Sequence, residues 1–202
     1  MQFVLASGSP RRRELLASLG ITFSVIKPDI DETQQDDEPP LDYVQRLSIE
    51  KAHAVAARLD SAMVLAADTV VILAADTMGI LDGEILGKPA ADADARHMLQ
   101  RLRGRAHIVC TALTLLQQTN GVGTHQHTRL TQTRVTMRDY GDDQMDAYIA
   151  TGDPFDKAGS YAIQHEGFHP VEHIDGSYSN VVGLPLESLR EMLDRIGYTY
   201  TK

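Results

Sequence analysis

A continuous apolar run at residues 63–73, rich in β-branched side chains, constrains the fold more than any other feature. Only the pair Asp68-Thr69 interrupts it. A strand with one solvated face alternates apolar and polar residues, so an unbroken run predicts a strand that is buried on both faces. A carboxylate within such a strand lowers stability unless it is paired, hydrogen-bonded or bound to a metal ion. Asp68 is therefore the strongest candidate for a catalytic or metal-binding group.

Segments with strand and helix patterns alternate along the 202 residues. The patterns predict strands at residues 3–6, 23–26, 63–73, 106–117 and 128–138, and helices at residues 10–19, 41–59, 91–102, 144–151 and 186–196. This loose alternation predicts an α/β fold with a mixed central sheet flanked by helices. Because no linker divides the chain, we expect a single domain over residues 1–202.

The first turn joins a strand to a helix and carries three arginines. Ser9 is a good N-cap, and Pro10 suits the first helical position. Arg11, Arg12 and Arg13 then fall in the first turns, where positive charge opposes the helix macrodipole. The backbone amides of such a turn and neighbouring guanidiniums bind phosphate. The segment therefore indicates a phosphate site, with a solvated helix start as the alternative.

The net charge of −9 disfavours nucleic acid and anionic membranes as partners. No apolar stretch reaches the about 20 residues of a membrane span, and the first residues do not have the pattern of a signal peptide. We therefore expect a cytoplasmic protein that binds neither nucleic acid nor membrane. Cys110, the single cysteine, cannot form an intrachain disulfide, and the apolar residues around it predict a buried thiol.

Further polar groups lie in loops and on one helical segment. Asp31-Glu32 lies in an acidic loop at residues 29–38, and Lys51 lies on the amphipathic segment 41–59. Loops dense in glycine and polar residues occupy residues 87–89, 152–159 and 176–185. Such loops often surround a ligand. Each loop could equally be a plain turn, and each charge alone could be an ordinary surface charge.

Taken in order, these segments form a specific string. Ser-Gly-Ser-Pro-Arg-Arg is followed by the Asp-Glu loop, Glu-Lys-Ala, Ala-Asp-Thr-Val-Val, Gly-Lys-Pro, Asp-Lys-Ala-Gly-Ser-Tyr-Ala-Ile-Gln and Asn-Val-Val-Gly-Leu-Pro-Leu. Across residues 3–193 the chain closely resembles the Maf family, once named for septum-formation inhibitors and now regarded as nucleotide pyrophosphatases. The resemblance implies an elongated α/β fold with a central mixed sheet and two lobes around a cleft, similar to inosine triphosphate pyrophosphatases. It also implies a homodimer and a divalent metal ion, magnesium or manganese.

Matching positions carry the implied reaction, in which water attacks a nucleoside triphosphate and releases the monophosphate and pyrophosphate. By this resemblance Asp68 accepts the proton of that water, and Glu32 and Asp68 hold the metal ion. Lys51 belongs both to this catalytic set and to the residues that line the triphosphate. The other implied substrate contacts are Ser7, Arg12, Arg13, Lys88 and Lys157.

Three positions indicate the substrate. The family branch that prefers dTTP and UTP has Arg after the Ser-Pro, Thr after the motif Asp and Gln before the next loop, whereas the branch that prefers 7-methyl-GTP has Trp, Gln and Glu. This chain has Arg11, Thr69 and Gln164, so it resembles the dTTP/UTP branch. His165-Glu166 departs from the family's Gly after the Gln and could narrow the base pocket. Two alternatives stay open: a pyrophosphatase for purine or 7-methyl-GTP substrates, and a nucleotide-sensing regulator of cell division.

One departure from the family pattern bears on the catalytic aspartate. Residues 66–73 are repeated at once as residues 74–81, with changes at two positions. The second copy contains Asp76, which has the usual family spacing to the following Asp-Gly turn. Asp68 has the usual spacing back to Lys51. Two aspartates therefore compete for the catalytic position.

The local pattern favours Asp68. An apolar lead-in at residues 63–65 continues into it as a strand, whereas Gly79 weakens the strand character of the second copy. Extra residues also lower the stability of the fold less at a hairpin tip than upstream of a buried strand. We therefore predict a lengthened hairpin in which Asp68 is active and Asp76 is a spare residue near the tip.

Overall fold

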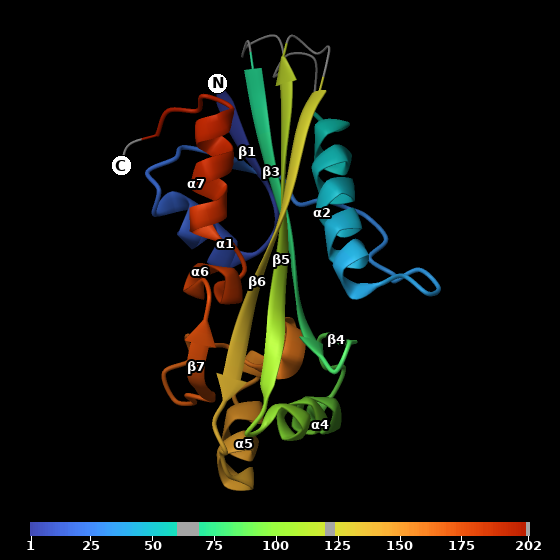
Figure 1. Cartoon of the computed structure of the whole chain (residues 1–202), viewed down its shortest axis with the longest axis vertical. Coiled ribbons are helices and arrows are strands. Elements are labelled where there is room, and N and C mark those ends of the chain that lie inside the picture. Colours follow the sequence, from blue (N-terminus) through green and yellow to red (C-terminus); the bar gives the residue numbers. More distant parts are fainter. Residues whose placement is uncertain (60–68, 120–123, 201–202) are drawn as a thin grey trace. The chain divides into compact units, whose positions relative to one another are not determined.

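The computed structural model describes residues 1–59, 69–119 and 124–200 of the chain (Figure 1). The chain divides into two compact units. The first unit combines Met1–Asp76, Thr111–Thr131 and Gly183–Lys202, and the second combines Thr77–Cys110 and Gln132–Val182. Each unit is therefore assembled from segments that are distant in sequence. The single domain expected over residues 1–202 stays a prediction.

In the described part of the chain, a seven-stranded sheet is the centre of the fold. Its strands are β1 (Gln2–Ala6), β2 (Ser24–Val25), β3 (Thr69–Leu81), β4 (Glu84–Leu86), β5 (Ala106–Thr119), β6 (Thr124–Met137) and β7 (Val171–Asp175). Their order is β2-β1-β3-β5-β6-β7, with β4 paired to β3. β1 runs parallel to β2 and β3, whereas β4 and β7 run antiparallel to β3 and β6. The predicted α/β fold with a mixed sheet is confirmed.

Helices and short helical turns complete the described structure. The first unit contains α1 (Pro10–Ala17), α2 (Pro40–Ala56) and α7 (Leu186–Arg195). The second contains α4 (Asp92–Leu102), α5 (Asp142–Ile149), α6 (Tyr178–Val182) and the 3₁₀ turns η1 (Asp153–Asp156) and η2 (Ala158–Ser160). The longer helices lie where their periodicity predicts them, whereas β4, β7, α6, η1 and η2 are too short to show a period. Within the described ranges, no helix is long and apolar enough to cross a membrane.

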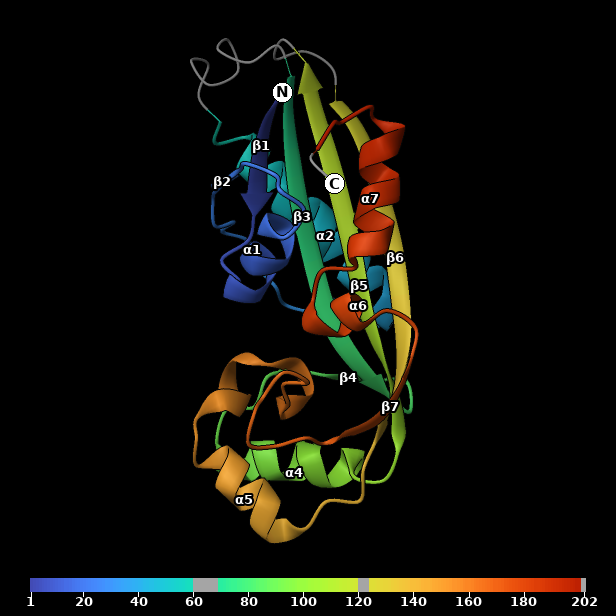
Figure 2. The same cartoon turned by 90° about the vertical axis from the view of Figure 1, so that its left-hand side faces the viewer.

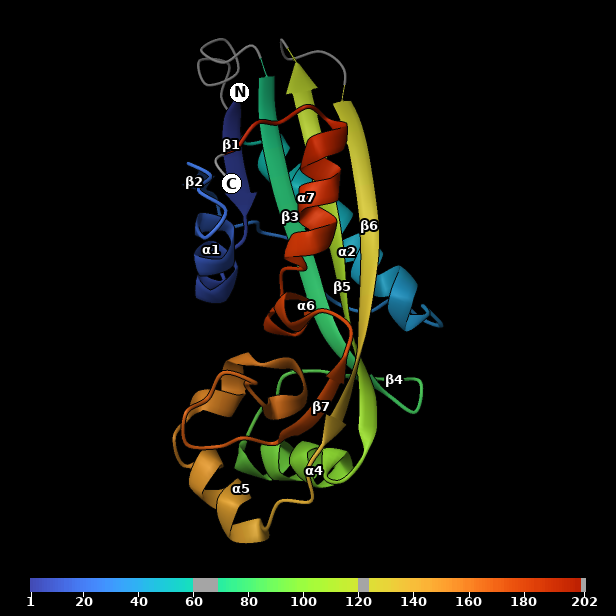
Figure 3. The ribbon, with the colours of Figure 1, turned by 60° about the vertical axis from the view of Figure 1, so that its left-hand side comes forward.

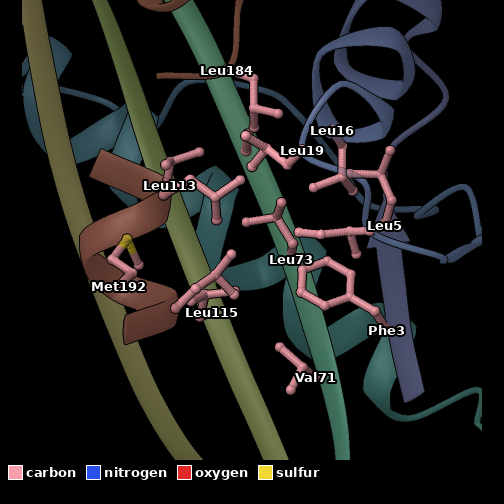
Figure 4. Close-up of a cluster of buried hydrophobic side chains, with 14 residues drawn as sticks. Phe3, Leu5, Leu16, Leu19, Val71, Leu73, Leu113, Leu115, Leu184 and Met192 are labelled. Atoms are coloured by element: carbon pink, nitrogen blue, oxygen red, sulfur yellow. The ribbon is translucent and has the colours of Figure 1, made fainter. Parts of the chain in front are cut away.

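In the first unit, β1 and β3 are buried on both faces. Val4 is paired with Ile72, and Leu5 with Leu73. Because side chains alternate across a strand, the two pairs face opposite sides of the sheet. Leu5 and Leu73 pack with side chains of α1 and α7 (Figure 4), whereas Val4 and Ile72 pack with side chains of α2. Figure 2 shows α2 and α7 on opposite sides of these strands. For residues 70–73 of the predicted strand, burial on both faces is confirmed, whereas residues 63–68 lie outside the described residues.

β3 continues through the second copy of the repeat, which corrects the predicted hairpin. The turn lies at Asp82-Gly83, where φ is 53° and 84°. Gly79 stays within the strand and pairs with Leu86 of β4. A Cβ on Gly79 would lie 3.3 Å from Leu86 Cδ1, so the bare glycine gives this leucine room to pack. The predicted place of Asp76 near a hairpin tip is wrong, because burial of the surrounding strand outweighs the low strand propensity of one glycine.

The start of α1 follows the prediction. Ser9 is the N-cap, its hydroxyl accepts a hydrogen bond from the Arg12 amide at 3.4 Å, and Pro10 opens the helix. Leu16 is buried in the core, and Gly20 has a φ of 69° just after the helix. Cap chemistry therefore predicts this helix start correctly, because its signal is local.

The second unit has a core of its own. Leu99 and Leu102 of α4 pack in one cluster with Met145 and Tyr148 of α5. The two helices are in contact, and Figure 3 shows them beside one another. Tyr148 is buried and stacks on Phe168 with ring centroids 4.5 Å apart. The predicted burial of Cys110 is also confirmed, and burial raises the pKa of this thiol to about 12.

Candidate active site

Polar residues of the first unit converge beside the end of β1. Ala6, the last residue of β1, is paired with Ala74 of β3. Ser7 follows β1, and Asp76 lies two residues beyond Ala74 on the neighbouring strand. Because side chains alternate, Asp76 faces the same side of the sheet as Ala74, which packs with the residues of α2. The register of β1 and β3 therefore directs Asp76 toward Lys51 of α2.

Lys51 joins two carboxylates at this place. Its Nζ lies 2.6 Å from Asp76 Oδ1 and 2.9 Å from Glu32 Oε1. The side chains of Lys51 and Asp76 are only 8% and 13% exposed, whereas that of Glu32 is 55% exposed. The pair of Lys51 with Asp76 is thus an interior ion pair, and Glu32 reaches it from the solvent side.

Arg12 and Ser7 form the adjoining part of the site. Arg12 Nε donates to the carbonyl of Gly183 at 2.9 Å, and its Nη1 donates to Ser7 Oγ at 3.3 Å. Ser7 Oγ also accepts from the Ser9 amide at 3.2 Å. Burial lowers the pKa of Arg12, and the nearby charge of Asp76 opposes that shift. A guanidinium in this setting remains charged and offers a fork of donors to a phosphate.

Tyr43 lies beside these site residues, and the sequence interpretation did not predict it. Its hydroxyl donates to the carbonyl of Glu32 at 2.7 Å. Burial raises the pKa of Tyr43, and the charges of Asp76 and Glu32 raise it further. Tyr43 precedes Lys51 by two successive four-residue steps on α2, so both lie on one stripe of the helix. That spacing is the signal that could have identified it.

Glu32 and Asp76 are the two carboxylates that could hold a metal ion. Both oxygens approach the same ammonium, so the two side chains converge. Magnesium is often held by one or two carboxylates and otherwise by water and substrate phosphates. The donor set therefore fits such an ion. Within the described residues, no group of three or more His, Cys, Asp or Glu is arranged to hold a metal ion by itself.

The predicted catalytic Asp68 lies outside the described residues. Thr69 is the first residue of β3, and its side chain also lies outside them. Their assigned roles stay predictions. The structure brings Asp76, the aspartate of the second copy, to Lys51 and Glu32.

The other predicted residues lie elsewhere. Arg11 is half-buried and Arg13 is exposed on α1, whereas Lys88, Lys157 and Gln164 belong to the second unit. Lys88 and Gln164 are exposed. Their predicted roles in substrate binding and specificity remain predictions.

Lys157 is held by its own loop. Its Nζ donates to the Asp153 carbonyl at 2.6 Å, to Asp153 Oδ1 at 2.8 Å and to Asp156 Oδ1 at 2.6 Å. An ammonium has three donors, so these three oxygens can take all of them. In this arrangement Lys157 stabilises the loop, and a phosphate must displace one of these contacts to reach it.

Comparison with known proteins identifies the family of this chain. The family model described as Maf-like protein matches residues 2–196. The chain belongs to the Maf family. The motif string therefore predicted the family correctly. The match covers both units of the structure.

Curated members of the family are similar over almost their whole length. A dTTP/UTP pyrophosphatase of Shewanella oneidensis is 49% identical over 98% of this chain and 99% of its own. The protein of the same name from Myxococcus xanthus is 49% identical over 96% of this chain and 92% of its own. Among solved structures, the Ham1 protein of Staphylococcus aureus is 16% identical over 97% of this chain and all of its own, with a TM-score of 0.48. The family assignment rests on the family model and the curated relatives.

Proposed function

We propose that the protein is a nucleoside triphosphate pyrophosphatase that hydrolyses dTTP and UTP to the monophosphate and pyrophosphate. Membership of the Maf family and relatives named dTTP/UTP pyrophosphatase at 44% to 49% identity support this activity. The structural observation that supports this activity is the convergence of Lys51, Asp76 and Glu32 beside Arg12. Cations and carboxylates in this combination suit the transfer of a phosphoryl group to water.

In this proposal Asp76 takes the catalytic position that the pattern assigned to Asp68. Its carboxylate accepts a proton from the water that attacks the α-phosphorus. The bond from that phosphorus to the oxygen bridging to the β-phosphate breaks, and pyrophosphate leaves with the bond's electron pair. The Lys51 ammonium moves from the two carboxylates to the incoming phosphates, because the triphosphate carries more negative charge than either carboxylate. Asp76 is thereby released to act as a base. Thr77 then takes the place after the motif aspartate that Thr69 has in the first copy.

The remaining cations and polar groups complete the proposed substrate contacts. Ser7, Arg12 and the amides at the start of α1 bind phosphate oxygens, together with Arg13, Lys88 and Lys157. Arg11 and Gln164 contribute to the choice of a pyrimidine base. Glu32 and Asp76 would hold a magnesium or manganese ion, which, when bound, supplies positive charge to neutralise the triphosphate.

The proposal extends to the setting of the enzyme. We place it in the cytoplasm as a homodimer, with a nucleoside triphosphate as its partner and no nucleic acid or membrane. The net charge of −9 supports the last point, because it repels polyanions.

The decisive experiment measures pyrophosphate release from a panel of canonical, methylated and deaminated nucleoside triphosphates with Mg²⁺ or Mn²⁺. We expect dTTP and UTP to be the best substrates. Turnover confined to other bases would retain the pyrophosphatase and reject the specificity. A panel without any turnover would favour a nucleotide-sensing protein instead.

The two copies of the repeat provide a matched pair of variants. Asp76→Asn is expected to lower kcat by about 10²- to 10⁴-fold, the contribution of a positioned general base. Asp68→Asn changes the same residue type in the same local sequence and should leave turnover close to that of the unmodified protein. The reverse result would return the catalytic role to Asp68.

A further inference from the structure

Glu32, which is far more exposed than Lys51 and Asp76, lies on a loop with no regular structure. The acidic loop at residues 29–38 contains neither helix nor strand, and residues 31–37 are exposed. It therefore lacks the buried apolar side chains that hold most loops to a protein core. Yet the carboxylate of Glu32 is aimed at Lys51 Nζ, 2.9 Å away. Polar contacts must therefore hold the acidic loop in place.

Arg46 of α2 makes most of these contacts. Its Nε and Nη2 donate to Glu38 Oε1 and Oε2 at 2.7 Å and 2.8 Å, which is a two-pronged ion pair. Nη2 also donates to the carbonyl of Thr33 at 3.1 Å. Arg46 therefore grips the acidic loop at Thr33 and at Glu38. Because the Arg46 and Glu38 side chains are only 19% and 9% exposed, water weakens this pair less than an ordinary surface pair.

Both points of this grip follow Glu32 in the chain, and Thr33 is its direct neighbour. Next to it, Asp31 Oδ1 accepts from the amide and the hydroxyl of Thr33 at 2.9 Å and 2.6 Å. The Glu32 carbonyl accepts from the hydroxyl of Tyr43, and the guanidinium of Arg46 lies 5.5 Å from the centre of the Tyr43 ring. Arg46 thus contacts two of the residues that set the backbone at Glu32, namely Thr33 and Tyr43.

We propose that Arg46 is a positioning residue, whose grip on Thr33 and Glu38 holds the acidic loop against α2 and presents the Glu32 carboxylate to the site. This role rests on the proposed function, in which Glu32 is one of two carboxylates for a divalent cation. Arg46 itself touches neither substrate nor cation. A planar guanidinium suits the task because it can bind a carboxylate with two prongs and a carbonyl at the same time.

The principal test substitutes Arg46→Gln in the whole protein and has two readouts. By hydrogen exchange, amides of residues 31–38 should exchange at least about tenfold faster, because the loop opens more often, while those of β1 and β3 keep their rates. In turnover assays with dTTP, the half-saturating Mn²⁺ concentration should rise and kcat should fall by about 10- to 100-fold, as expected when a reacting group is displaced. The KM for dTTP at saturating Mn²⁺ should change little.

Companion variants separate positioning from general damage. Glu38→Gln should reproduce the effect, and the double variant with Arg46→Gln should be no worse than either single one, because both remove the same contact. Arg46→Lys keeps the charge but loses the two-pronged contact, so it should rescue only part of the activity. Arg58→Gln is the matched control: Arg58 donates to the Lys27 carbonyl at 2.8 Å, outside the acidic loop, and both readouts should be unchanged.

Two results would overturn the inference. Unchanged exchange at residues 31–38 in Arg46→Gln would show that Arg46 does not hold the loop. Faster exchange with an unchanged Mn²⁺ requirement and kcat would show that the hold does not position Glu32. If the unmodified protein hydrolyses no nucleotide, the proposed function fails, whereas the exchange readout still decides whether Arg46 holds the loop.

Discussion

At the scale of single residues, the site depends on charges that have little contact with water. Lys51 and Asp76 are almost fully removed from solvent and are joined at 2.6 Å. An interior charge that loses its partner destabilises the fold more than the intact pair stabilises it, because the remaining charge is neither hydrated nor paired. The same arrangement that prepares an ammonium for phosphate therefore makes these two residues important for stability.

This asymmetry predicts the behaviour of Lys51→Met. The variant leaves Asp76 without its ammonium, and we expect the free energy of unfolding to fall by about 3 kcal/mol. Combining it with Asp76→Leu removes the stranded charge and should restore most of the loss, although not the activity. Urea unfolding of the single and double variants measures both values. A double variant that is less stable than either single one would contradict the interpretation.

At the scale of elements, the end of β3 shows which residues determine a hairpin. Asp82 and Gly83 both have positive φ, which is typical of a two-residue turn between antiparallel strands. The Asp82 carboxylate also pairs with Arg105 Nη2, at 2.8 Å for both oxygens. The turn therefore lies at the Asp-Gly pair that the sequence indicated, whereas Gly79, which was expected to weaken the strand, lies within it.

Gly83→Ala tests this turn. No atom lies within 4 Å of the position where its Cβ would be, so the cost comes from the φ of +84° alone. We expect a loss of about 1–2 kcal/mol in the free energy of unfolding. Gly87→Ala is the control, because its Cβ would also meet nothing within 4 Å and its φ is not in the left-handed range. Equal unfolding free energies for the two variants would mean that backbone conformation is not the cause.

At the scale of the whole molecule, the two compact units each have a buried core, and an ionisable group is buried against a core residue of the second unit. His107 is buried, and its Nε2 lies 2.9 Å from the hydroxyl of Tyr161. In the described structure its Nδ1 has no hydrogen-bond partner. Burial lowers the pKa of His107 from 6.5 to about 4, so the folded protein keeps this imidazole neutral.

The lowered pKa predicts how stability depends on pH. Below pH 6.5 the unfolded chain binds a proton at His107, whereas the folded chain does not bind one until about pH 4. This group therefore leaves the free energy of unfolding unchanged above pH 6.5 and lowers it as the pH falls from 6.5 toward 4. At pH 5 we expect a loss of about 2 kcal/mol from this group. Urea unfolding between pH 7.5 and pH 4.5 measures it, with His107→Gln as the variant whose profile should be flatter. Parallel profiles would assign the acid sensitivity to other groups.

Much of the protein was determined by its sequence alone. The unbroken apolar run predicted a strand buried on both faces, because an exposed face would have required alternating polar residues. Ser9-Pro10 predicted the start of α1, since capping involves only neighbouring residues. The ordered motifs predicted the family and brought Ser7, Arg12, Glu32 and Lys51 into one candidate site.

Only the tertiary structure shows that Asp76 lies beside Lys51 and Glu32. The two copies of the repeat contain the same Ala-Ala-Asp-Thr, and the local pattern around them favoured Asp68 over Asp76. Pairing of Ala6 with Ala74 brings Asp76 to Lys51, because strand register is set by the packing of both sheet faces and not by the residues of one strand. The hold of Arg46 on the acidic loop likewise joins residues that share no period. Its contacts exist only because α2 and that loop are packed together in the folded chain.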